Sequence, residues 1–175
     1  MVDVLGHFAT SLLVAAPVWA VLNRRSALAF LGFVVLTAML PDIDLYLPWV
    51  VHHGATHTLL FVAILAAVGA AVAVLAAPDV LARWSPWVDT ARATPGRLYG
   101  FALSGLFLGG TVHVVFDMLS TSATEQVVRP FWPFFEKPFS LYVITSFSEP
   151  RWNAVPFVVA LALHAVMYRR RTIEG

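Results

Sequence analysis

Long apolar segments with almost no charge constrain the fold of this chain more than any other feature. Only 12% of its 175 residues are charged and 59% are hydrophobic, whereas about a quarter of an ordinary soluble domain is charged. Because a bilayer offers no partner for an unpaired backbone N–H or C=O group, such segments fold as helices. The sequence therefore predicts an all-α, integral membrane helical bundle, with one membrane-embedded domain over residues 1–175. The five apolar segments are Val4–Leu22, Ala27–Leu40, Thr58–Ala77, Leu98–Val115 and Ala154–Tyr168.

Three of these segments are long enough to cross a membrane. A spanning helix needs about 20 residues, with about 17 as the lower limit, and the first, third and fourth segments meet this requirement. Asp3 is the only charge ahead of the first segment, so we expect that segment to be retained as a helix and not removed as a signal peptide. The second and fifth segments are shorter, and half-buried, re-entrant or fully spanning arrangements stay open for both.

The basic residues predict the orientation of the bundle. If the five segments cross in alternation, eight arginines fall on one side, which the positive-inside rule makes cytoplasmic. The other side receives three basic residues spread over a long loop. We therefore predict a multi-pass protein of the cytoplasmic (cell) membrane, with its N-terminus outside and its C-terminus inside. The eight are Arg24, Arg25, Arg83, Arg92, Arg97, Arg169, Arg170 and Arg171, and the three are Arg129, Lys137 and Arg151.

The loop Leu119–Arg151 is rich in aromatic residues and proline. Pro130, Pro133 and Pro138 exclude a long regular helix, and the aromatic residues of its FWPFFEKPF stretch suit the lipid headgroup layer. Its segment Leu141–Phe147 is compatible with a short strand or with an interfacial segment.

Composition also limits the chemistry. The chain has no cysteine, which excludes disulfides, thiolate metal sites and cysteine nucleophiles. A metal ion would have to be held by His, Asp or Glu, ligands that suit zinc, manganese or iron. The net charge of +1 gives no sign of a nucleic-acid partner.

Imidazole and carboxylate groups gather in one predicted layer of the membrane. Six of them lie near segment ends that alternation places on the outer side, where charged and polar groups are costly and usually functional. Metal sites in helical bundles draw ligands from several facing helices in this way. The sequence therefore predicts a metal site near the outer surface. The six candidate ligands are His7, Asp42, Asp44, His57, His113 and Asp117.

Each motif also has a simpler interpretation. His113 and Asp117 stand at an i, i+4 spacing that stacks them on one helix face, but a hydrogen bond between them could merely seal the helix end. Asp42 and Asp44 follow Pro41 and can both point inward only in a turn; they could equally be solvated. His7 alone is more often interfacial than a ligand.

A third motif runs from His52 to Thr58. Gly54 gives its backbone room for an unusual turn, and Thr56 is a natural N-cap for the following helix. The start of that helix also favours an anionic group such as a phosphate. An interfacial histidine cluster without a ligand is the alternative. His164 lies far from these motifs, and we expect it to be structural or interfacial.

Taken together, these motifs resemble those of the YdjM-type (DUF457) family of membrane-bound, metal-dependent hydrolases. The family pattern is an N-terminal GH, then PDxD, HRGxTHS and HxxxD. The corresponding residues are Gly6-His7, Pro41 to Asp44, His52 to Thr58, and His113 to Asp117. His53 stands where the family usually has Arg, and Thr58 where it usually has Ser.

The family is in turn distantly similar to zinc-dependent phospholipases C and P1-type nucleases. That resemblance implies zinc ligands at His7, at Asp42 or Asp44, and at His57, His113 and Asp117, with Asp117 as a bridge between two ions. The later His and Glu ligands of the soluble enzymes have no evident match here, although Glu125, Glu136 and Glu149 are available. One or two divalent ions are therefore expected, with zinc favoured over manganese or iron.

These observations predict a hydrolase acting on a phosphoester or a phospholipid headgroup at the outer membrane surface. We place Asp42, Asp44 and His52 as its candidate catalytic residues, because a carboxylate that is not a ligand could act as general base. Arg129 could pair with a phosphate or simply be solvated. Membrane lipid is the expected partner. Two alternatives stay open: an ion- or proton-coupled transporter, and a non-catalytic membrane protein stabilised by metal.

Overall fold

The computed structural model describes residues 4–84, 94–119, 127–141, 143–144 and 149–173, and its regular elements are all helical. The described residues contain no strand, so the all-α prediction is confirmed. The α-helices are α1 (Val4–Ala15), α2 (Val18–Val21), α3 (Arg24–Thr37), α4 (Leu59–Trp84), α5 (Pro95–Met118) and α6 (Ala154–Ile173). Two 3-10 turns, η1 (Pro41–Tyr46) and η2 (Ala55–His57), lie between α3 and α4.

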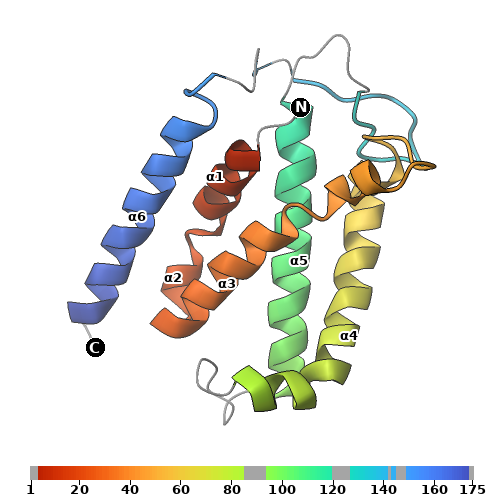
Figure 1. Ribbon diagram of the computed structural model, residues 1–175. Coiled ribbons are helices and arrows are strands. Elements are labelled where there is room, and N and C mark those ends of the chain that lie inside the picture. The colour runs from red at the N-terminus through yellow and green to blue at the C-terminus, as the bar shows by residue number, and fades with distance from the viewer. Residues whose placement is uncertain (1–3, 85–93, 120–126, 142, 145–148, 174–175) are drawn as a thin grey trace.

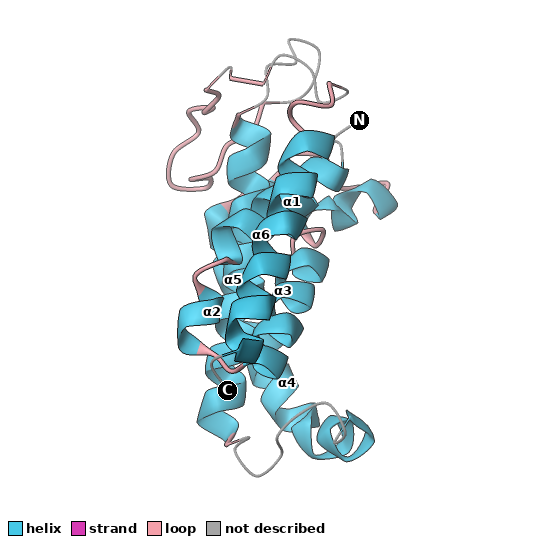
Figure 2. Cartoon of the chain, turned by 90° about the vertical axis from the view of Figure 1, so that its left-hand side faces the viewer, coloured by secondary structure: helices cyan, strands magenta, loops and turns pink. Residues whose placement is uncertain are grey.

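Helix α5 is the centre of the bundle (Figure 1). Helices α1, α3 and α4 all pack against α5, and α6 packs against α1. The N- and C-termini lie at opposite ends of the bundle (Figure 1), and the side view shows the helices running lengthwise through it (Figure 2). We call the end that holds η1, η2 and the last turn of α5 the site end, and the other the basic end.

Three helical stretches are long and apolar enough to cross a membrane: Val4–Val21, Leu59–Ala77 and Pro95–Met118. They correspond to the first, third and fourth predicted segments. The segment Val4–Leu22 does not form the single continuous helix that was predicted. The helix is interrupted between α1 and α2 at Pro17, because proline has no backbone N–H to donate. Helix α3 has 14 residues, which is short for a full crossing.

A close crossing between α3 and α5 brings η1 to the core of the bundle. A Cβ atom at Gly109 would lie 2.8 Å from the carbonyl oxygen of Val34 and 2.9 Å from the backbone nitrogen of Ala38. The Thr37 hydroxyl donates to the carbonyl oxygen of Gly105 at 3.0 Å across the same crossing. Only glycine allows the two backbones to approach so closely, and the crossing fixes where η1 begins.

The loop after α5 returns over the site end. The backbone N–H of Leu59 donates to the carbonyl oxygen of Pro130 at 2.8 Å, and that of Leu141 donates to Met118 at 2.7 Å. The described part of this loop forms no helix, as predicted from its prolines. Within Leu141–Phe147, Ile144 forms one isolated bridge, and residues 142 and 145–148 lie outside the described residues.

Polar contacts of a different kind hold the basic end together. The Trp19 indole N–H donates to Nδ1 of His164 at 2.7 Å, and Nε2 of His164 in turn donates to the carbonyl oxygen of Leu12 at 3.0 Å. Arg171 donates to the carbonyl oxygen of Trp19, and the Arg24 guanidinium lies over the ring of Tyr168. These contacts join α1, α2, α3 and α6, and His164 has the structural place expected of it.

Candidate metal centre

The six predicted ligands come together at the site end of the bundle. They reach it from four separate elements: the start of α1, the turn η1, the end of η2 and the last turns of α5. Every one of these side chains is buried, and the three imidazoles are completely buried. The predicted layer of ligands is therefore a compact cluster in space. Its members are His7, Asp42, Asp44, His57, His113 and Asp117.

Five of the six spacings among four donor atoms of this cluster match those of a tetrahedral metal site. Nε2 of His57 and Nε2 of His113 are 3.2 Å apart. Oδ1 of Asp42 lies 3.4 and 3.3 Å from these two nitrogens, and Oδ2 of Asp117 lies 3.4 and 3.1 Å from them. Ligands about 2.0–2.1 Å from a tetrahedral ion are themselves about 3.3–3.4 Å apart. These side chains could accept an ion with little movement.

Asp117 also faces a second group of donors. Its Oδ1 lies 3.4 Å from Nε2 of His7, while its Oδ2 faces His57 and His113. The rings of His7 and His113 are stacked, with centroids 4.0 Å apart and planes 10° from parallel. The set of His7, His113 and Asp117 offers ligand atoms within 4.8 Å of one another. The carboxylate of Asp117 thus stands between His7 on one side and His57 and His113 on the other.

Asp44 contacts the opposite side of the His57 ring. Its Oδ2 accepts from the Thr56 hydroxyl at 2.6 Å and lies 3.1 Å from Nδ1 of His57. The Thr56 oxygen is also 3.1 Å from that nitrogen. Since Thr56 gives its proton to Asp44, both neighbours of Nδ1 are acceptors, and Nδ1 carries the hydrogen. The lone pair of His57 is then on Nε2, which faces the other donors.

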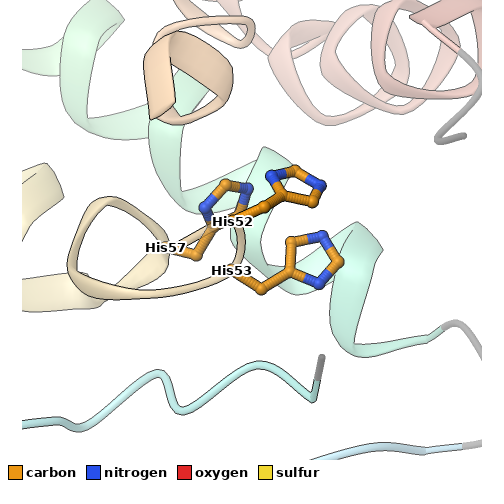
Figure 3. Close-up of side chains that lie close together, drawn as sticks. All are labelled: His52, His53 and His57. Carbon is orange, nitrogen blue, oxygen red and sulfur yellow. The ribbon is translucent and has the colours of Figure 1, made fainter. Parts of the chain in front are cut away.

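The loop before η2 brings two further histidines to the cluster. Nδ1 of His52 lies 3.0 Å from Oδ1 of Asp44, and the His52 and His53 rings are 4.0 Å apart. His53 lies with its Nε2 3.9 Å from Oδ2 of Asp117. Figure 3 shows the rings of His52, His53 and His57 gathered around the loop that carries them. Their ligand atoms can lie within 4.8 Å of one another.

The backbone of this loop adopts the unusual turn expected at Gly54, with one difference. Gly54 has φ −83° and ψ −132°, and a Cβ atom there would lie 2.6 Å from the carbonyl oxygen of Val51. The left-handed residue, however, is His53, with φ 60°. Such a conformation is uncommon for a residue with a side chain and costs about 1–3 kcal/mol.

The predicted N-cap at Thr56 is wrong. Helix α4 begins at Leu59, and the hydroxyl oxygen of Thr58 accepts from the backbone N–H of Phe61 at 3.0 Å. Thr58 is therefore the N-cap of α4. The η2 turn occupies Ala55–His57, so the α-helix starts only after it. Thr56 is instead committed to Asp44 and His57. Its position next to His57 was the only sequence signal of that contact.

The hydrogen bonding of the cluster is incomplete within the described chain. Both ring nitrogens of His7, Nδ1 of His113 and Oδ1 of Asp42 are buried without a hydrogen-bond partner there. Each such group costs about 1–3 kcal/mol when left unsatisfied, so several at one place call for a compensating ligand. Three imidazoles and two carboxylates form a donor set that suits a divalent cation. The residues present therefore fit a metal ion.

The charge on Asp42 also suits a cation. Burial raises the pKa of its carboxyl, but the neighbouring rings of His113 and His57 outweigh burial and hold that pKa below its ordinary value. Asp42 is therefore an anion at neutral pH even before a metal binds.

Other residues considered from the sequence lie apart from the cluster. Glu136 and Arg129 are exposed on the loop after α5, and Glu149 forms an ion pair with Arg151. Glu125 lies outside the described residues. His164 is at the basic end, with both ring nitrogens engaged.

The model of the YdjM inner membrane protein family matches residues 1–174, which is nearly the whole chain. The comparisons with curated proteins and with solved structures give no match. The family description and the apolar helices both indicate a multi-pass protein of the inner membrane. The chain thus belongs to the YdjM inner membrane protein family.

Proposed function

We propose that this protein is a metal-dependent hydrolase that cleaves a phosphoester, with a phospholipid headgroup as the favoured substrate. The observation that carries the proposal is that carboxylate oxygens of Asp42 and Asp117 each lie 3.1–3.4 Å from the Nε2 atoms of both His57 and His113. A divalent ion in this cluster that keeps one coordination position open would supply Lewis acidity and lower the pKa of a bound water toward neutrality. Zinc suits this set of nitrogen and oxygen ligands best, and manganese and iron are the alternatives.

The two sides of Asp117 suit different roles. The group with Asp42, His57 and His113 has enough protein donors to fill a tetrahedral ion, as in structural zinc sites. The group around His7 has fewer protein donors and would leave room for water and a substrate oxygen. One or two ions are consistent with this arrangement, and Asp117 is the bridge in the case of two.

The two candidate carboxylates of η1 also suit different roles. Asp42 directs Oδ1 toward the two Nε2 atoms, which makes it a ligand. Asp44 contacts Nδ1 of His57, so it would orient that ring from outside, as carboxylates do around many metal-bound histidines. His52 also contacts the Asp44 carboxylate, through its Nδ1, and its side chain is about a third exposed. This position suits the exchange of protons with solvent.

The surroundings of the cluster support an amphiphilic substrate. The loop that is tied to the start of α4 through Leu59 and Pro130 exposes several large aromatic side chains. Aromatic residues of this kind favour the boundary between lipid and water. A substrate held in the membrane would present its headgroup at this depth. The exposed aromatic residues are Phe131, Trp132, Phe134, Phe135 and Phe139.

Transport is less well supported. Transport sites usually lie near the middle of the membrane, on broken helices. His7 is near the first residue of the stretch Val4–Val21, and Asp117 is near the last residue of Pro95–Met118. By the positive-inside rule the cluster would face the extracytoplasmic side, because Arg24, Arg97 and the arginines that end α6 lie at the other end of the bundle.

The test is hydrolysis by the full-length protein in detergent, with phospholipid in mixed micelles and a soluble phosphomonoester as parallel substrates. We expect headgroup release that stops with chelator, returns with zinc and is lost in His113→Ala. His164→Gln, which changes a histidine at the basic end, is the matched control and should keep its activity. A protein that binds metal but hydrolyses neither substrate would be a metal-stabilised membrane protein and not an enzyme of this class.

A further inference from the structure

The buried cluster raises the question of how an ion reaches it. The side chains of His7, His57, His113 and Asp117 have no exposed surface, and that of Asp42 has 10%. The His52 side chain is 33% exposed. Among the described histidines and acids of the cluster, His52 is therefore the one that an ion in water can meet first.

We propose that His52 and His53 form an entry site, which captures a divalent metal ion from water and passes it to the buried donors. This inference rests on the proposed metal centre. It concerns a different step, namely how fast the centre fills, and different residues from the buried ligands.

The chemistry of His52 suits capture. Its Nδ1 lies 3.0 Å from Oδ1 of Asp44, and a carboxylate at that distance accepts the ring hydrogen. The lone pair of the neutral ring is then on Nε2, the nitrogen that can bind a metal. Asp44 thus contacts Nδ1 of His52 through Oδ1 and Nδ1 of His57 through Oδ2, and leaves Nε2 of each ring to bind a metal.

The possible donor sets overlap from the exposed rim at His52 to the buried interior at His57 and His113. Asp42, Asp44 and His52 form one possible set, and His52, His53 and His57 form a second. A third set shares His57 with the second and adds Asp42 and His113. An ion could therefore move inward by exchanging one ligand at a time, without being released to water or lipid. Such an exchange avoids the large cost of placing a bare cation in an apolar medium.

His53 is the physical link between rim and interior. Its ring is 4.0 Å from that of His52 and 4.7 Å from that of His57, and its Nε2 is 3.9 Å from Oδ2 of Asp117. The left-handed backbone at His53 holds two successive side chains on the same side of the loop, which an extended backbone would direct to opposite sides.

The donor sets differ in charge, which sets the expected direction of transfer. The rim set of His52, His53 and His57 contains no carboxylate. The buried donors include the carboxylates of Asp42 and Asp117, which lie 3.1–3.4 Å from the Nε2 atoms of His57 and His113. We therefore expect the rim to bind weakly and briefly, and the buried centre tightly.

The test measures uptake and affinity separately on the metal-free, full-length protein in detergent. Zinc ion is the probe, and its transfer from a chromophoric chelator is followed by rapid mixing. His52→Gln and His53→Gln remove the imidazoles, and Val51→Ala, an exposed neighbour on the same loop, is the control. We expect uptake to slow several-fold in the glutamine variants, with the equilibrium affinity unchanged because the buried donors stay in place.

A further variant separates a ligand role from a structural one. His52→Cys places a different metal ligand at the same position in a chain that otherwise has no cysteine, and it should restore fast uptake. Equal uptake rates in wild type and the glutamine variants would overturn the entry site while leaving the metal centre intact. The same holds if affinity falls in step with rate, or if the cysteine variant stays slow. A wild-type protein that takes up no zinc would overturn both proposals.

Discussion

Nε2 of His57 and Nε2 of His113 lie 3.2 Å apart, although 56 positions separate the two residues in the chain. One is at the end of a 3-10 turn and the other is on α5. Each of these nitrogens also has two carboxylate oxygens, from Asp42 and Asp117, within 3.4 Å. This relationship is more typical of ligands around one cation than of ordinary packing, and the following predictions depend on it.

The two carboxylates of η1 should differ in their effect on metal binding. Asp42→Asn removes a proposed ligand and should abolish tight binding. Asp44→Asn removes only the support of the His57 ring and should weaken binding about 10–100-fold, the usual effect of an outer partner. Competition with a chelator of known affinity measures both. Equal effects in the two variants would argue against the separate roles.

Zinc should stabilise the protein against unfolding. An ion that binds only the folded state adds about 2.7 kcal/mol when its concentration is 100 times the dissociation constant. We expect a higher Tm with zinc in wild type and no shift in His113→Ala. Thermal unfolding in detergent, with and without added zinc, provides the measurement. A shift of the same size in His113→Ala would place the ion elsewhere.

Gly109→Ala should disturb both the helix crossing and the site. The added Cβ would meet backbone atoms of Val34 and Ala38, which cannot rotate away, so we expect a loss of about 1–3 kcal/mol, as in other overpacked cores. Because α3 leads directly into η1, metal affinity should fall as well.

Gly100→Ala on the same helix is the matched control for that variant. A Cβ atom at Gly100 would meet nothing within 4 Å, and alanine is the better helix former, so stability should stay equal or rise by up to about 1 kcal/mol. If the two alanine variants had the same Tm and the same metal affinity, the close crossing would not be what positions η1.

His164→Ala should affect stability without affecting metal binding. The substitution removes the contacts to Trp19 and Leu12, and leaving the buried indole N–H unpaired costs about 1–3 kcal/mol. Denaturation should therefore shift to lower temperature while zinc content stays at the wild-type level. Loss of zinc in a variant that still folds would show that this histidine belongs to the site.

Local spacing made part of the site predictable from the sequence. His113 and Asp117 share a helix face because they are four residues apart, and their side chains do meet, with Nε2 and Oδ2 3.1 Å apart. The apolar segments likewise predicted a helical bundle, because no other backbone arrangement suits their composition. In both cases the information lies within one helix.

The rest depends on contacts between elements. Asp42 and Asp44 could not be told apart, because the 3-10 turn η1 and the α3–α5 crossing determine which oxygen faces which nitrogen. The N-cap of α4 is Thr58 and not the predicted Thr56, because the Thr56 hydroxyl instead donates to Asp44, which lies twelve residues earlier. The break at Pro17 was visible in the sequence, but hydropathy alone did not detect it.

The most direct test of the central claim is the metal content of the purified protein, measured by elemental analysis on wild type beside His57→Ala, Asp117→Ala and His164→Gln. The four-donor cluster predicts about one or two tightly held divalent ions per chain in wild type and His164→Gln. It predicts almost none in His57→Ala and Asp117→Ala, provided that each variant remains folded. Wild-type protein without metal, or equal metal content in all four proteins, would contradict it.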